Sequence, residues 1–212
     1  MSTENPQDVM EPVREAASRD DDLRTRVRQL VTDAILKREA DPKAIHSVMQ
    51  AAMAGLGTGL AQRAGQTGDA LKEAVGGLDQ AIARSTYAMR MAIEEAAGQG
   101  RQFSEQDLNE ARDALRRMEA DLMDLLKQTG EKTQGALKGE FDRLREHLSH
   151  NGTDTGTQVR DMLDVLKGKL AAAGAGAASE AGQTVREASG RLAAVTSGIL
   201  RGLADAIDAK TR

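Results

Sequence analysis

Apolar residues recur every three or four positions along almost the whole chain, which is the spacing that places side chains on one helix face. These stripes predict helices over residues 23–40, from Pro42 to about residue 62, and over 71–96. The first helix should stop near Ala40, because Asp41 precedes a proline and avoids helical backbone angles. Gly65 and Gly68 indicate a break before the third helix, and the run GQGRQ (98–102) ends it.

The next helix has the most specific start signal. In RQFSEQDLNEA (101–111), Ser104 can cap the helix, Asp107 can complete an acidic capping box, and Phe103 and Leu108 occupy the staple positions. The stripe then alternates spacings of three and four residues, as in a coiled coil, and it resumes after Gly130. We expect the following residues to form a helix-packing interface: Leu108, Leu115, Met118, Leu122, Leu125, Leu137, Phe141 and Leu144.

The last part of the chain changes character. After the turn-like run HNGTDTGT (150–157), apolar residues recur at intervals of eleven, at positions 159, 170, 181, 192 and 203. This period is close to that of a straight helix. The pattern divides the chain into a disordered acidic lead-in (1–20), a helical bundle (21–151) and a long Ala/Gly-rich amphipathic segment (157–212). It leaves open whether Gly130 and Gly152 form turns or lie inside continuous helices.

The stretch AAMAGLGTGLAQRAG (51–65) is unusually rich in glycine and lies in a run, 44–62, that has no charged residue. A dinucleotide-binding fingerprint would need glycine where Leu60 stands and a strand before it, so the phosphate-loop reading fails. What remains is a smooth helix face, on which small residues allow close approach. The candidate close-packing or surface-binding residues, here and in the last segment, are Gly55, Gly59, Leu56, Leu60, Leu170, Val185, Leu192, Ile199 and Leu203.

Composition supports thin helix seams. The 212 residues include one Tyr, two Phe and no Trp, so few bulky rings are present to fill a thick core. The sequence therefore predicts an all-α fold, an elongated antiparallel helical bundle with coiled-coil-like packing and no β-sheet. Because few bulky residues are available to one chain, we expect the helices to associate with a second copy, as a homo-oligomer.

Charge and chemistry narrow the function. Both signs are mixed with a net charge of −4, which does not suggest a nucleic-acid partner, and cysteine is absent. His147 and His150 lie three apart, but a zinc site needs three or four ligands and nothing nearby completes one. We expect no catalytic site, no cofactor, no metal and no small-molecule substrate. The polar N-terminus has no signal-like apolar core, so we expect a cytoplasmic protein.

The run 88–126, and within it EEAAG (94–98) with FSEQDL (103–108), resembles an uncharacterised proteobacterial family of Ala-rich helical proteins that is described as a domain of unknown function. This resemblance implies a helical bacterial protein and brings no catalytic residues. A looser similarity, in composition alone, is to phasins, the coat proteins of polyhydroxyalkanoate granules.

Two functions follow as hypotheses. The first is a non-enzymatic interaction or scaffold protein that self-associates through Leu/Ala/Met helix faces. The alternative is a phasin-like amphipathic coat protein that binds a storage granule or a membrane surface through residues 159–207.

Overall fold

The computed structural model describes residues 7–19, 22–37, 42–63, 67–98 and 105–176. These residues form seven helices and no strand, so the predicted all-α fold is confirmed. The helices are α1 (Gln7–Arg19), α2 (Leu23–Lys37), α3 (Pro42–Gln62), α4 (Thr67–Gly98), α5 (Glu105–Lys132), α6 (Ala136–Asn151) and α7 (Asp154–Gly176).

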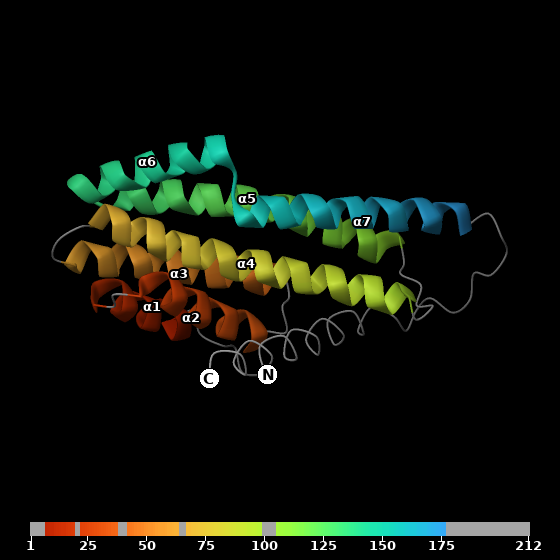
Figure 1. Ribbon diagram of the computed structural model, residues 1–212, viewed down its shortest axis with the longest axis horizontal. Coiled ribbons are helices and arrows are strands. Elements are labelled where there is room, and N and C mark those ends of the chain that lie inside the picture. The colour runs from red at the N-terminus through yellow and green to blue at the C-terminus, as the bar shows by residue number, and fades with distance from the viewer. Residues whose placement is uncertain (1–6, 20–21, 38–41, 64–66, 99–104, 177–212) are drawn as a thin grey trace.

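The helices stack into an elongated bundle, with α4 running along most of its length (Figure 1). The short helices α1 and α2 lie beneath α3 and the first half of α4, where α1 packs on α3 and α2 packs on α4. On the opposite side, α6 and α7 follow one another along α5, with a step between them at Gly152–Thr153. The second half of α4 packs mainly against α7.

Helix boundaries agree closely with the apolar stripes. The second predicted helix begins at Pro42, where the missing N–H of proline is no loss because a first-turn N–H has no helical partner. The core is built from Leu, Ile, Val, Met and Ala of all seven helices, and Phe141 is its one fully buried aromatic side chain among the described residues. Helix interfaces built from these aliphatic side chains need few aromatic rings.

The predicted disordered lead-in is wrong for residues 7–19, which form α1. Val9, Val13, Ala16 and Ala17 share one face of this helix and are buried. Pro12 lies inside α1 and cannot donate a backbone hydrogen bond, but burial of the apolar face outweighs this loss. Residues 1–6 and 20 lie outside the described part of the chain.

The segment that begins at 157 is not separate from the bundle. Its helix, α7, starts at Asp154 and packs against α4 and α5. Residues 177–212, the rest of the predicted amphipathic segment, lie outside the described residues.

Gly130 and Gly152, whose roles the sequence leaves undecided, differ in the structure. Gly130 lies within α5, which continues to Lys132, and a Cβ atom there would lie 2.8 Å from Cβ of Phe141. The chain turns instead at Gly135 and at Gly152, whose φ angles of 65° and 79° favour glycine. Gly130 is therefore a packing glycine, and Gly152 is a turn.

Candidate binding surfaces

The glycine-rich face of α3 is covered by α1. A Cβ atom on Gly55 would collide with the backbone oxygen of Met10, and one on Gly59 would collide with that of Arg14. Both contacts would be far below the 3.0 Å that real Cβ atoms respect. The face seen in the sequence thus receives an N-terminal helix of the same chain.

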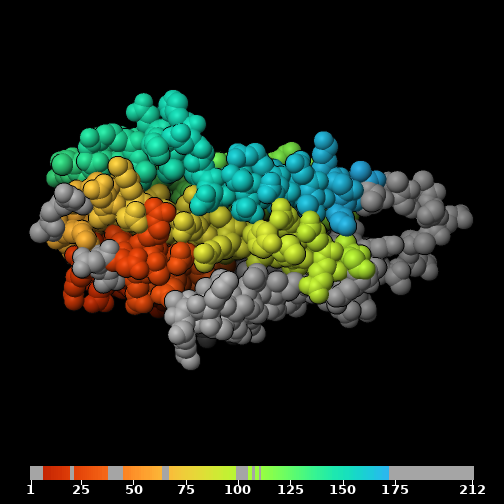
Figure 2. All heavy atoms as spheres, in the orientation of Figure 1, coloured from red at the N-terminus to blue at the C-terminus, as the bar shows by residue number. Residues whose placement is uncertain are grey.

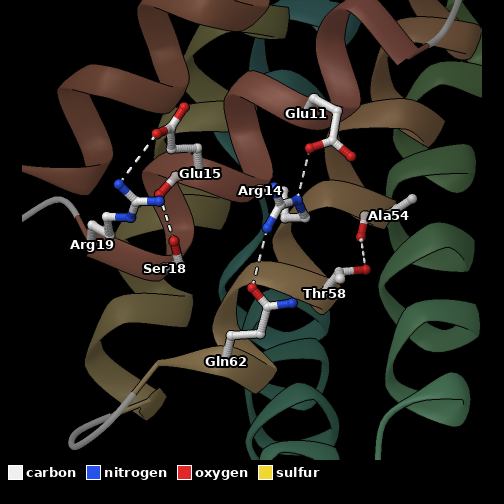
Figure 3. Close-up of polar contacts among 8 residues, drawn as sticks. All are labelled: Glu11, Arg14, Glu15, Ser18, Arg19, Ala54, Thr58 and Gln62. Carbon is white, nitrogen blue, oxygen red and sulfur yellow. Dashed lines mark hydrogen bonds and ion pairs between the residues drawn. The ribbon is translucent and has the colours of Figure 1, made fainter.

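Polar contacts at the edge of this interface hold the two helices in register (Figure 3). Arg14 donates to Glu11 on its own helix at 2.8 Å and to Oε1 of Gln62 on α3 at 3.2 Å. Thr58 turns its hydroxyl back to the carbonyl oxygen of Ala54 at 3.0 Å. The Thr58 hydroxyl is therefore paired within its own helix.

A second glycine contact, which the sequence reasoning missed, joins α2 to α4. A Cβ atom on Gly77 would collide with the backbone oxygen of Arg24. The Arg24 guanidinium also forms a two-pronged ion pair with Glu73, at 2.8 and 3.2 Å. The adjacent glycines 76 and 77, beside the apolar stripe of this helix, were the feature of the sequence that could have indicated this close contact.

The predicted packing residues of α5 and α6 are all buried, and the structure places them in one core cluster: Leu108, Leu115, Met118, Leu122, Leu125, Leu137, Phe141 and Leu144. Leu56 and Leu60 join the same cluster from α3, and Leu170 packs partly buried against it. Val185, Leu192, Ile199 and Leu203 lie outside the described residues. So do Phe103 and Ser104 of the predicted cap, although α5 begins at Glu105, directly after Ser104.

The step between α6 and α7 is fixed by a buried carboxylate on α4 that the sequence analysis did not single out. Asp79 on α4 is 7% exposed and accepts the backbone N–H groups of Asp154 at 2.8 Å and Thr155 at 2.9 Å. Thr155 also donates its hydroxyl to the Asp79 carbonyl oxygen at 3.2 Å. The first N–H groups of α7 are thus capped by a side chain from another helix.

Thr153 completes this junction. Its hydroxyl oxygen accepts the N–H of Gly156 at 2.8 Å, the usual N-cap arrangement, and the hydroxyl donates to Oε1 of Glu119 on α5 at 3.2 Å. Burial raises the pKa of Asp79 above its ordinary value, and the hydrogen bonds from Thr155 and Asp154 offset part of that rise. This carboxylate therefore serves as a structural cap for α7.

The three histidines each contact a neighbouring polar group. His147 and His150 are exposed on α6, where Asn151 bonds His147 and the carbonyl oxygen of Glu146 contacts His150 at 2.8 Å. His46 lies 2.9 Å from Asp121. No group of three potential metal ligands occurs among the residues that the structure describes.

An exposed stripe follows α4 along its second half. Tyr87 and Met91 are 40% and 38% exposed, and they are the large hydrophobic side chains that the described surface leaves open. The Arg90 guanidinium lies 4.9 Å from the centre of the Tyr87 ring and also bonds Asp161 on α7 at 3.3 Å. This part of α4 reaches the surface beside α7 (Figure 2).

Three polar residues and a glycine extend the stripe in both directions. Gln80 and Arg84 precede Tyr87, and Glu94 and Gly98 follow Met91, so the six positions alternate spacings of four and three residues. We call these six residues the α4 stripe. Arg84 is partly desolvated and lies near Arg28, and these two effects lower its pKa.

A groove of about 1040 Å³ lies along α3. Its lining comes from the start of α1, one side of α3, the last two turns of α5 and the beginning of α6. Among the described helices, none is both long and apolar enough to cross a membrane.

A family model described as "Family of unknown function (DUF6781)" matches residues 1–209. No curated protein and no solved structure matches the chain.

Proposed function

The chain belongs to DUF6781, a family of unknown function, and we propose that it is a non-enzymatic helical interaction protein that pairs with a second copy of itself through α4. The observation that carries the proposal is the self-complementary α4 stripe. Its centre is apolar, and a positive residue and a negative residue stand at equal distances on either side.

An antiparallel α4–α4 pair centred between Tyr87 and Met91 would place each Tyr87 opposite the partner's Met91. The same register would place each Arg84 opposite the partner's Glu94. Alternating spacings of three and four residues are those of antiparallel coiled-coil seams. A two-fold axis repeats every contact, so one helix face supplies both sides of the interface.

Charge supports this pairing. Arg84 lies near Arg28 and forms no ion pair with another described residue, so a carboxylate from outside would relieve the excess positive charge. The contact between Arg90 and the Tyr87 ring limits the ring's freedom before association, which reduces the entropy lost on binding. The interface is one helix wide, and we expect a dissociation constant of about 1–100 μM.

The expected alternative, a phasin-like coat protein, would use the apolar face of residues 159–207. Within α7, Val159, Met162 and Leu166 are already buried against the bundle. A coat function that used this part of the face would therefore require α7 to leave α4 and α5, and the self-pairing function would not. Flotation with liposomes or polyester granules separates the two ideas, because the self-pairing protein stays in the soluble fraction.

Light scattering coupled to size-exclusion chromatography tests the self-pairing. At about 1 mM, tenfold above the upper end of the expected range of dissociation constants, the wild type should approach twice its 22.6 kDa chain mass and fall towards that mass on dilution. Arg84→Glu and Glu94→Arg should each yield monomers, because each places like charges opposite one another. A wild type that remains a 22.6 kDa monomer at this concentration would overturn the proposal.

Mixing sharpens the test. The double variant Arg84→Glu/Glu94→Arg should regain the dimer, and an equimolar mixture of the two single variants should form a mixed dimer. Both results depend on the paired positions and not on charge alone. Asp113→Lys, at an exposed position on α5, serves as the matched control and should pair as the wild type does.

A further inference from the structure

The groove along α3 has a lining that differs from the rest of the surface in charge. The chain contains 33 acidic residues among 212, yet none of the described residues that line this groove is Asp or Glu. The lining includes two cations, Arg63 at the end of α3 and Lys132 at the end of α5. An anion entering the groove would therefore be attracted by these two cations and would meet no carboxylate from the described lining.

The floor of the groove is formed mostly by small, apolar side chains. From α3, Ala51, Ala54 and Ala61 lie along it, and Leu125 and Leu137 contribute from α5 and α6. The Thr58 hydroxyl is satisfied by the Ala54 carbonyl oxygen, so an aliphatic chain beside it would leave no polar group newly unpaired (Figure 3). The lining on α3 extends from Ser47 to Ala61, which is about 21 Å of helix.

One end of the groove adds polar donors. Ala136 and Leu137, the first residues of α6, line it, and the N-cap residue Gly135 gives this helix no side-chain cap. The helix start and Lys132 thus lie on the two sides of the same short turn. Glu140 lies near this end against Gly68, but Arg143 forms an ion pair with it.

We propose that this groove binds a single-chain amphiphile with a carboxylate head group, with its aliphatic chain along α3 and its carboxylate between Lys132 and the start of α6. Arg63, whose guanidinium contacts the Ala17 carbonyl oxygen at 3.4 Å, adds positive potential at the end of α3. The groove volume of about 1040 Å³ is ample for a medium-length chain. The site is independent of the α4 stripe.

Calorimetric titration of the full-length chain with sodium decanoate tests the proposal. We expect saturable binding with one molecule per chain. Decanol and decyltrimethylammonium should bind at least about tenfold more weakly, because they lack the anion. Acetate and inorganic phosphate should show no saturable binding, because they lack the chain.

Two variants locate the site. Lys132→Gln should weaken decanoate binding about tenfold, and Ala54→Leu should abolish it by filling the exposed floor. Ala120→Leu, at an exposed alanine of α5 outside the groove, is the matched control and should bind as the wild type does. Circular dichroism of each variant verifies that the helices remain folded.

The proposal is overturned if Ala54→Leu binds decanoate as well as the wild type does. Equal binding of decanoate and decyltrimethylammonium would also overturn it, because the anion would then have no role. The monomeric variant Arg84→Glu should bind decanoate normally. This result separates the groove from the proposed self-pairing, since either proposal can then fail alone.

Discussion

Asp79 and Thr155 lie 76 positions apart in the sequence, and the carboxylate of Asp79 accepts the backbone N–H of Thr155 at 2.9 Å. Together with the bond from Asp154, this contact attaches the start of α7 to the middle of α4. A side chain from one helix therefore performs the capping that a local residue usually provides.

Replacement of Asp79 should destabilise the protein strongly. In Asp79→Ala, the first N–H groups of α7 lose their buried acceptor, and we expect a loss of about 2–4 kcal/mol in the free energy of unfolding. Urea denaturation followed by circular dichroism measures this loss. Asp142→Ala, at an exposed position on α6, should change stability by less than about 0.5 kcal/mol.

The same carboxylate should make stability depend on pH. Because burial raises the pKa of Asp79, the folded protein binds this proton more readily than the unfolded chain does. The contribution of Asp79 to stability is therefore complete below the ordinary aspartate pKa and is lost as pH rises through the higher folded value. As the pH falls from about 7 to about 4, the unfolding free energy of the wild type should rise relative to that of Asp79→Asn. A fall in the unfolding free energy of the wild type relative to that of Asp79→Asn over this range would indicate that the folded pKa of Asp79 is lowered.

Gly59→Ala should separate α1 from α3. The added methyl group would collide with the Arg14 backbone oxygen, which can move only if the helix moves, and we expect a loss of about 1–3 kcal/mol. Gly168→Ala in α7 meets nothing within 4 Å and should stabilise the protein by about 0.5–1 kcal/mol, because alanine favours helix. Thermal unfolding compares the two. Equal effects would contradict the close approach of α1.

Thr153→Ala should cost about 1 kcal/mol, because the Gly156 N–H loses its cap. Thr153→Ser retains the hydroxyl and should restore most of the loss. Hydrogen exchange at the first turn of α7 should rise in the alanine variant more than exchange in the middle of α5. Equal unfolding free energies for the alanine and serine variants would argue against a capping role.

Periodicity in the sequence is enough to predict most of the helices, because a stripe of Leu and Ala and a nearby proline or glycine determine where each can begin and end. It does not predict α1, since Pro12 and the acidic surroundings resemble a tail until α3 is available as a packing surface. The role of Asp79 could not be predicted either. Asp79 is the one charged residue between Glu73 and Arg84, but its partners are 75 and 76 positions away, and only the fold brings the start of α7 to it.

For the glycines too, the sequence predicts part of their role and the fold determines the rest. Gly55 and Gly59 could be recognised as a close-packing face, but the sequence does not say which helix lies against them. Gly130 resembled a helix end, although its small size serves the approach of Phe141. The exposed side of α3 and the cations of the groove come from separate helices, so no local motif announces them.

The step at Gly152–Thr153 also has a consequence for how chain length can vary. Because Asp79 and Glu119 fix the start of α7 against both long helices, α6 can gain or lose residues at its Gly135 turn without shifting α7 along the bundle. Relatives that differ in length should therefore place insertions and deletions near residues 133–136, where the bundle can lengthen at one end while the other half keeps its register.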